Sequence, residues 1–241
     1  MKVYIQARQG MPCNHNFYNA YQGFHEMGIE TIFFDKWEEL RKSLQEDIVV
    51  GYVNTVRNRL FEFGIQVPEV NYPEELQKYM GRKTWFSKIN TINSHPELWP
   101  VFVKPIQNKR FTGVVVRSPK DLVGCGSYHE DIDVICSEVL TIKAEWRVFI
   151  RYDEILDVRP YKGDWRAHYN PNIIDMAVKE FTNAPAGYAI DFGVTDKGET
   201  VLIEVNDGYA LGSYGLLDVY YAKLLSARWA ELTKTVDECN F

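Results

Sequence analysis

The sequence predicts an α+β fold in which a small α/β part precedes a larger, β-rich part. Three observations support this: strands and helices alternate over the first 72 residues, strands dominate from residue 100, and an amphipathic segment closes the chain. A chain of 241 residues is long enough for one large domain or two small ones.

The first part is expected to form a small parallel sheet, because short apolar runs alternate with segments of helical periodicity. Two prolines in segment 67–73 interrupt this alternation. We therefore expect a small α/β domain at residues 1–72 and a second domain at residues 73–241. The elements expected in the first domain are strand 2–6, helix 17–27, strand 31–34, helix 37–44 and strand 48–53.

The second part contains short apolar runs separated by turn residues, which is typical of antiparallel sheets. Two hairpins are expected, one turning at residues 153–154 and one at Asp196-Lys197-Gly198. The elements expected here are a helix start at 73–79, strands at 101–104, 114–117, 134–139, 146–152, 155–158, 188–194 and 200–205, and helices at 172–181 and 216–232.

Composition narrows the function classes. The formal net charge is -6, from 27 basic and 33 acidic residues, and a nucleic-acid-binding surface usually shows a basic excess. The N-terminus turns polar at once, and the chain has no apolar run of membrane-spanning length. Four cysteines without C-x-x-C spacing suit free thiols in a reducing compartment. We expect a cytoplasmic protein without nucleic-acid or membrane partners; its oligomeric state is left open.

The second hairpin carries the strongest chemical signal. Glu204 and Asn206 are two apart on one predicted strand and share a face, and the antiparallel partner strand can bring Asp191 beside them. Three oxygen-bearing side chains on one face suit Mg²⁺. A lone E-x-N at a strand end is more often a solvated polar end, but here the polar pair alternates with Ile203 and Val205, which favours a metal site.

A lysine at the end of an apolar strand gives the second signal. Lys104 follows Val101-Phe102-Val103 and precedes Pro105. Burying a lone cation is costly, so an anion is expected nearby, and phosphate is one that lysine serves well. The alternative is a lysine that extends from a strand end into solvent, which is about as frequent for this motif alone.

A third signal is the run from Cys136 to Leu140 followed by Glu145-Trp146-Arg147. A strand that leads into a loop with an acid can bind adenine through its backbone and ribose through a carboxylate. Glu145 and Arg147 share a strand face, and Arg159, on the next strand of the hairpin, can lie beside Arg147. Two adjacent arginines suit an anion between them, although Arg147 could instead pair with a surface acid.

In this order, the motifs resemble those of the ATP-grasp superfamily over about residues 80–225, and more narrowly a compact carboxylate–amine ligase clade of bacteria and phages. The resemblance implies two α+β subdomains that clasp ATP, preceded by a small α/β domain. It also implies the cofactors ATP and Mg²⁺ and a set of site residues. These are Lys83, Lys104, Glu138, Val139 and Glu145 for the nucleotide, Asp191, Glu204 and Asn206 for the metal, and Arg147, Arg159 and Lys162 near the transferred phosphoryl group.

One departure from the family concerns the loop that covers the phosphates. That loop is usually rich in glycine, whereas residues 107–113 contain one glycine and two cations, Lys109 and Arg110, either of which could reach a phosphate. If the arginines do not hold the substrate carboxylate, the loop from Gly208 to Gly215 is the next candidate.

The function implied is an ATP-dependent ligase that forms an amide or peptide bond through an acylphosphate and releases ADP and phosphate. Its partners would be a carboxylate and an amine acceptor, which could be an amino acid, a peptide or a protein tail. Three alternatives remain: a kinase-like phosphotransferase on the same nucleotide site, a non-catalytic nucleotide-binding module, and a Ca²⁺-binding structural protein. The last is disfavoured because the hairpin lacks a dense acidic loop.

Overall fold

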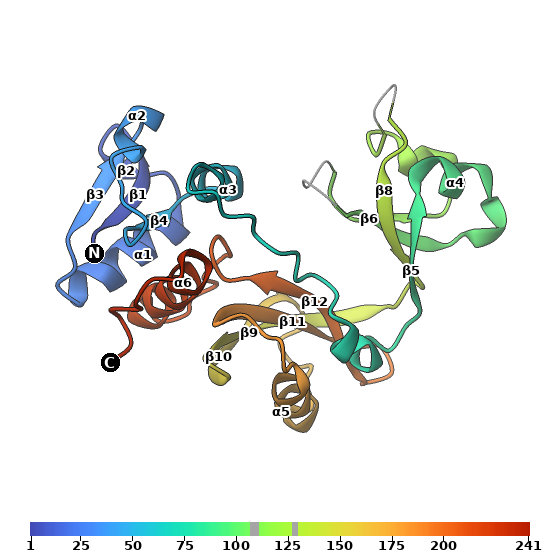
Figure 1. Cartoon of the computed structure of the whole chain (residues 1–241). Coiled ribbons are helices and arrows are strands. Elements are labelled where there is room, and N and C mark those ends of the chain that lie inside the picture. The colour runs from blue at the N-terminus through green and yellow to red at the C-terminus, as the bar shows by residue number, and fades with distance from the viewer. Residues whose placement is uncertain (107–110, 127–129) are drawn as a thin grey trace. The chain divides into compact units, whose positions relative to one another are not determined.

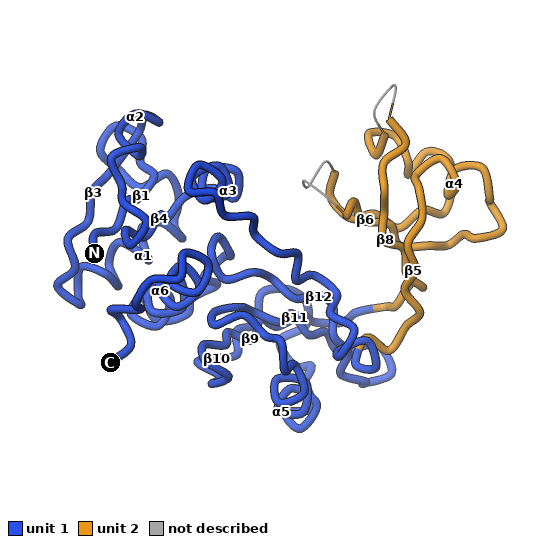
Figure 2. Tube along the Cα trace, viewed as in Figure 1, with its two compact units in different colours: residues 1–79, 142–241 blue, residues 80–141 orange. Residues whose placement is uncertain are grey.

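The computed structural model describes residues 1–106, 111–126 and 130–241 (Figure 1). The chain forms two compact units, one of residues 1–79 and 142–241 and one of residues 80–141 (Figure 2). This grouping by compactness differs from the division at residue 72 that the proline-rich segment suggested. The Lys109 and Arg110 expected to contact phosphate lie outside the described residues.

Unit 1 begins with the expected parallel sheet. Strand β1 (Val3–Arg8) pairs in parallel with β3 (Thr31–Phe34) and β4 (Ile48–Val50). A short strand, β2 (Met11–Pro12), pairs antiparallel with the end of β1. Helix α1 (His15–Glu26) follows the predicted periodicity, and the side chain of its N-cap residue, Asn14, accepts a hydrogen bond from the Phe17 amide at 3.1 Å. The strand and helix alternation predicted for this part is confirmed.

Residues 51–53 were wrongly predicted to continue the third strand. The strand ends at Val50, and helix α3 (Val53–Glu62), which the sequence reading missed, begins three residues later. Its buried residues Val56 and Leu60 recur at helical spacing. The preceding helix, α2 (Trp37–Leu40), is shorter than expected.

The second sheet of unit 1 is antiparallel, with strand order β10-β9-β11-β12. The strands of the first hairpin are longer than predicted. Helix α5 (Pro171–Glu180) and helix α6 (Asp218–Thr233) complete the unit, and a 3-10 helix lies at Glu74–Tyr79. The bounds of the strands are Ile142–Arg151 for β9, Glu154–Gly163 for β10, Gly187–Thr195 for β11 and Thr200–Asp207 for β12.

Helix α6 explains why residues 1–79 group with residues 142–241. It contacts α1 and β4 of the first sheet's layer and also β9 and β11 of the second sheet. Most of its residues are buried, including Tyr221, Leu225 and Trp229, so it lacks the single apolar face that the sequence suggested. A helix enclosed on several sides is apolar around most of its circumference.

Unit 2 is an antiparallel sheet of order β5-β8-β6-β7. Its core includes Ile92, Val101, Val103, Val134 and Cys136. The elements are β5 (Thr84–Lys88), α4 (Ile89–Ser94), β6 (Val101–Pro105), β7 (Val114–Val116) and β8 (Asp133–Ser137), with 3-10 helices at Pro96–Leu98 and Pro119–Leu122.

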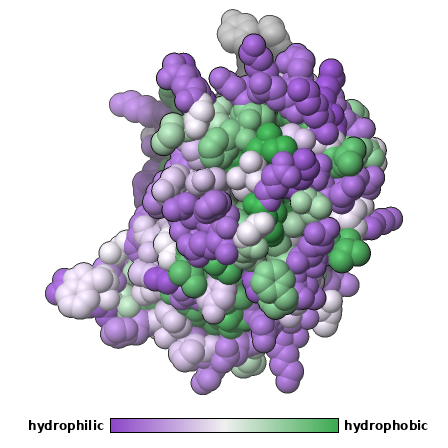
Figure 3. All heavy atoms as spheres, turned by 90° about the vertical axis from the view of Figure 1, so that its left-hand side faces the viewer, coloured by the Kyte–Doolittle hydropathy of each residue, from purple (hydrophilic) through white to green (hydrophobic). Residues whose placement is uncertain are grey.

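The surface seen in Figure 3, which views unit 1 from the side of its N-terminal sheet, mixes hydrophilic and hydrophobic residues without segregating them. Among the described residues, no helix combines the length and hydropathy that crossing a membrane requires. The four cysteines are free thiols, as expected.

Candidate active site

Four charged side chains form a row across the second sheet of unit 1, which we call the charged row. Register pairs Arg159 with Arg147, Arg147 with Asp191, and Asp191 with Glu204, on the strands β10, β9, β11 and β12. Directly paired residues on antiparallel strands project from the same face. The row therefore presents two cations and two anions side by side, on strands that lie about 4.8 Å apart.

The centre of the charged row is a buried ion pair. Arg147 donates to Asp191 twice, from Nε to Oδ1 and from Nη2 to Oδ2, both at 2.7 Å. The two residues are 6% and 2% exposed. The side-chain nitrogen Nδ2 of Asn206 donates to Asp191 Oδ2 at 3.1 Å. Planar, two-point contact of this kind fixes both the position and the orientation of the carboxylate.

Burial and charge act in opposite directions on this pair. Burial raises the pKa of the Asp191 carboxyl and the nearby Glu204 charge raises it further, whereas Arg147 and Asn206 lower it, leaving the pKa above its usual value. Burial lowers the pKa of Arg147, but the hydrogen bonds and charge of Asp191 outweigh it, so that this pKa is raised. The guanidinium therefore stays charged opposite the Asp191 carboxyl.

Asp191, Glu204 and Asn206 come together as the hairpin spacing predicted, and they supply two carboxylates and an amide oxygen. Hard oxygen donors of this kind fit Mg²⁺, which retains several waters or phosphate oxygens besides its protein ligands. No cluster of three or more His, Cys, Asp or Glu side chains able to hold a metal occurs in the part of the chain that the structure describes. A metal at this hairpin would therefore depend on the amide of Asn206.

Glu145, expected to face ribose, has two partners in the structure. Tyr161 donates its hydroxyl to Oε2 at 2.8 Å, and Lys162 Nζ contacts Oε1 at 2.5 Å. Glu145 and Lys162 are paired in register on β9 and β10. Lys162 was expected to serve the phosphoryl pocket, and here its ammonium group pairs with Glu145, two residues along β9 from Arg147.

Arg159 lies beside Arg147 as predicted, but no anion is shared between the two. Arg159 Nη2 contacts Asp157 Oδ2 at 2.6 Å, so each arginine has its own carboxylate. The Nε of Arg159 is buried and has no hydrogen-bond partner. A buried donor without an acceptor is costly, and this one lies next to a second guanidinium.

Two tyrosines cover the centre of the row. Tyr161 and Tyr214 stack with ring centroids 4.9 Å apart and ring planes 22° apart. The Arg147 guanidinium carbon lies 4.8 Å from the Tyr214 centroid and 5.8 Å from the Tyr161 centroid. Burial, and then the charges of Asp191 and Glu145, raise the pKa of Tyr161 well above its usual value, so its hydroxyl stays protonated and donates.

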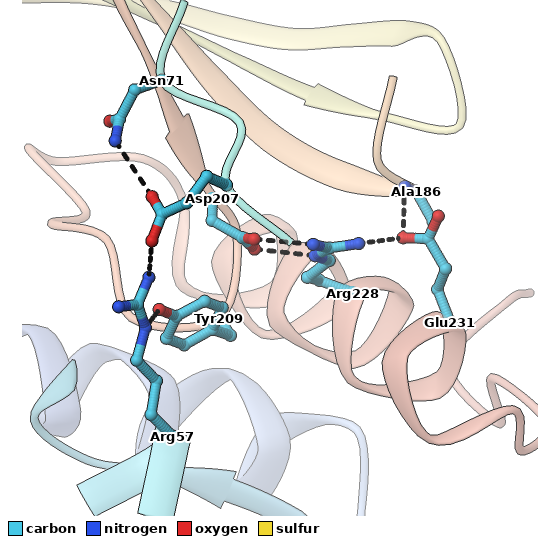
Figure 4. A network of polar contacts seen from close by, with 8 residues as sticks. Arg57, Asn71, Ala186, Asp207, Tyr209, Arg228 and Glu231 are labelled. Carbon is cyan, nitrogen blue, oxygen red and sulfur yellow. Dashed lines mark hydrogen bonds and ion pairs between the residues drawn. The ribbon is translucent and has the colours of Figure 1, made fainter. Parts of the chain in front are cut away.

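The end of β12, directly after Asn206, is anchored by a second buried ion pair (Figure 4). Arg228 of α6 donates to Asp207 from Nε at 2.7 Å and from Nη2 at 2.6 Å, and its Nη1 contacts Glu231. Two residues further on, the Tyr209 hydroxyl accepts from Arg57 Nε at 2.5 Å. The strand that carries Glu204 and Asn206 is thereby tied to α6 and α3.

In unit 2, the expected nucleotide contacts that the structure describes lie on strand β6 or directly beside the ends of β5 and β8. The alternation along β6 turns Val101 and Val103 toward the core and places Lys104 on the opposite face with Phe102. Lys83 and Glu138 are adjacent: the Glu138 amide donates to the Lys83 carbonyl, and the Glu138 carboxylate accepts from the Lys83 amide at 3.0 Å. Val139 follows β8 and is partly buried.

Comparison with known proteins identifies the family. A family model described as the ATP-grasp domain of R2K clade family 2 matches residues 79–224, more than half of the chain. The chain belongs to this ATP-grasp family. No curated protein is similar enough in sequence to match.

Several solved structures share the fold of this ATP-grasp protein. An N5-carboxyaminoimidazole synthetase from Staphylococcus aureus, complexed with ADP, is similar with a TM-score of 0.60 at 10% identity, over 98% of this chain and 78% of that one. A D-alanine–D-alanine ligase from Bacillus anthracis gives 0.57 at 14% identity, over 97% and 96% of the two chains. A macrocyclase bound with a precursor peptide, from Microcystis aeruginosa, gives 0.52 at 14% identity, over 93% and 99%. The α+β ATP-grasp fold predicted from the motifs is confirmed.

Sequence reasoning missed the two tyrosines and the Asp207–Arg228 pair. Tyr161 stands between two residues that were singled out, and Tyr214 lies in the loop named as an alternative site. Asp207 directly follows the E-x-N motif. These residues lie in or next to motifs noted in the sequence, but the local sequence did not indicate which side chain each would contact.

Proposed function

We propose that this chain is an ATP-dependent carboxylate–amine ligase that forms an amide bond through an acylphosphate. The observation that carries the proposal is the charged row, which sets Asp191 and Glu204, with Asn206 beside them, against two arginines on one rigid sheet. Membership of the ATP-grasp family supports ATP as the nucleotide, and the oxygen donors of Asp191, Glu204 and Asn206 support Mg²⁺ as the metal.

In this reaction an oxygen of the substrate carboxylate attacks the γ-phosphorus of ATP, and the bond from that phosphorus to the β-phosphate oxygen breaks, releasing ADP. An amine then attacks the acyl carbon, the carbon–oxygen bond to phosphate breaks, and the nitrogen loses a proton. Bound Mg²⁺ would neutralise charge on the phosphate oxygens. Asp191, Glu204 and Asn206 would hold the ion.

The arginines and lysines would position the anions. Arg159 offers a buried Nε without a partner, next to Arg147, and we assign it to the substrate carboxylate or the transferred phosphoryl group. Lys104 and Lys83 of unit 2 would contact phosphates, Glu138 and Val139 would contact adenine, and Glu145 would accept from ribose, with Lys162 beside it. Catalysis would then rest on positioning and charge neutralisation and needs no covalent nucleophile.

The test is incubation with Mg-ATP and a panel of amino acids and short peptides, with mass spectrometry of products and measurement of free phosphate. Glu204→Gln should abolish turnover and leave the fold intact, whereas Glu199→Gln, an exposed acid in the turn of the same hairpin, should not change it. Arg159→Ala should slow ligation far more than it weakens nucleotide binding, because its contact strengthens in the transition state.

Each other outcome identifies a different function. A stable phosphoester without free phosphate indicates the kinase-like phosphotransferase. Nucleotide binding without turnover of any acceptor indicates a binding module. Absence of binding at millimolar Mg-ATP contradicts the proposal.

A further inference from the structure

Tyr214 joins several contacts at the centre of the charged row. Its ring lies over the Arg147 guanidinium and stacks on Tyr161, whose hydroxyl is bonded to Glu145. The side chain of Tyr214 is 46% exposed, so the ring separates the buried ion pair from solvent.

The backbone at Tyr214 is held in a conformation that tyrosine disfavours. Its φ is +43°, in the left-handed region, and Gly215 follows at +83°. A bulky residue with positive φ persists only where the surroundings enforce it, and such strain is concentrated at functional sites. The strain by itself shows only that the loop is constrained.

The constraint comes from helix α1. Ser213 is fully buried; its amide and its hydroxyl both donate to Asn16 Oδ1 at 3.0 Å, and its hydroxyl accepts from Asn19 Nδ2 at 3.0 Å. Two residues before Ser213, the Leu211 carbonyl accepts from the Tyr221 hydroxyl at 2.6 Å. The loop is therefore fixed directly before Tyr214, and the Leu216 amide closes the turn around Tyr214 by donating to the Ser213 carbonyl at 2.8 Å.

We propose that Tyr214 is a positioning residue, which holds Arg147 on Asp191, excludes water from that pair and so orients the Asp191 carboxylate toward the metal. This inference rests on the proposed function where it concerns the metal, and on the structure alone where it concerns Arg147. Groups that orient a metal-binding carboxylate change metal affinity by about tenfold to a hundredfold when removed. Tyr214 acts one contact further out, so about tenfold is expected.

The strained backbone provides a variant that separates the ring from the fold. Tyr214→Gly removes the ring and relieves the positive φ, so the loop should keep its conformation. Tyr214→Phe keeps the ring, and the Tyr214 hydroxyl makes no hydrogen bond to residues 1–106, 111–126 or 130–241, so this variant should behave like the wild type.

Tyr152 provides a matched control in the same unit. It also has a positive φ, +47°, is 42% exposed, and lies 4.6 Å from an arginine, Arg151. It stands at the β9–β10 turn, directly after Arg151, which is four residues along β9 from Arg147 of the charged row. Tyr152→Gly removes an arginine–tyrosine ring contact away from the site, together with the hydrogen bond that the Tyr152 hydroxyl donates to Asp237 Oδ2 at 2.9 Å.

The first measurement needs no ligand. Exchange of the Arg147 Nε–H proton with water, followed by nitrogen-15 NMR and assigned with Arg147→Lys, should be about tenfold faster in Tyr214→Gly than in the wild type, Tyr214→Phe or Tyr152→Gly. Equal exchange in all four proteins would overturn the inference, whether or not the chain is a ligase.

The second measurement is calorimetric titration with ADP, with and without Mg²⁺. Tyr214→Gly should weaken Mg-ADP binding by about tenfold and leave metal-free ADP binding within twofold, whereas Tyr152→Gly and Tyr214→Phe should change neither. A general loss of structure would weaken both titrations. Unchanged or tighter Mg-ADP binding in Tyr214→Gly overturns the inference, while absence of Mg-ADP binding in the wild type overturns the proposed function instead.

Discussion

Breaking the buried pair of Asp207 and Arg228 from one side is expected to destabilise the chain strongly. Arg228→Met keeps most of the side-chain volume. The packing here is tight, because a Cβ added at Gly208 would lie only 3.2 Å from Arg228 Cβ. The substitution leaves the Asp207 carboxylate, whose two oxygens accept from Arg228 at 2.7 and 2.6 Å, buried without its cation. Breaking one side of a buried pair costs about 3–5 kcal/mol, a large share of a total stability of about 5–15 kcal/mol.

Urea unfolding followed by far-ultraviolet circular dichroism measures this cost. With a slope of about 3 kcal/mol per molar, the midpoint should fall by about 1 M or more. Arg166→Met is the matched control, because Arg166 also pairs with an aspartate but its side chain is 72% exposed, and exposed pairs contribute about 0–1 kcal/mol.

A double-mutant cycle decides whether the cost comes from the unpaired charge. Asp207→Asn combined with Arg228→Met removes both charges, and the double variant should be more stable than the sum of the single losses predicts. If Arg228→Met costs no more than Arg166→Met, or if the two changes are additive, the reasoning from the buried pair is refuted.

Two further predictions concern packing and pH. Gly23→Ala should destabilise the chain by about 1–3 kcal/mol, because the new Cβ would lie 2.0 Å from the Asp218 carbonyl oxygen where α1 meets α6, whereas Gln22→Ala on the same helix should be near neutral in the same urea assay; equal midpoints would contradict the close packing. Burial raises the pKa of the Cys136 thiol from 9.0 to about 11, so the folded chain keeps a proton in this range that the unfolded chain releases. The contribution of this thiol to the free energy of unfolding is complete below about pH 9 and is lost as the pH rises toward 11. The loss is about 2 kcal/mol at pH 10.5 relative to pH 8. Cys136→Ala should reduce this alkaline loss under reducing conditions and Cys13→Ala should largely keep it; the same loss in both variants would contradict the assignment.

The sequence by itself determined the elements whose signal is local. Apolar spacing located helix α1 and the three parallel strands of the first sheet, and the turn at residues 196–198 located the β11–β12 hairpin. The shared hairpin of Asp191, Glu204 and Asn206 also followed from the sequence. Their pairing did not follow from the turn alone, because a register shift after the Phe192–Leu202 pair places Glu204, rather than Ile203, opposite Asp191. The order of the motifs was enough to indicate the ATP-grasp family.

Only the tertiary structure decided what those residues contact. Arg147 is 44 residues from Asp191, and their pairing depends on the register between β9 and β11, which no short turn fixes. Tyr214 reaches Arg147 because α1, nearly 200 residues earlier, holds Ser213. Helix α6 is buried on most sides because it lies against two sheets that are distant in sequence. Local periodicity carries no information about such pairings, because each partner is selected by packing of the whole unit.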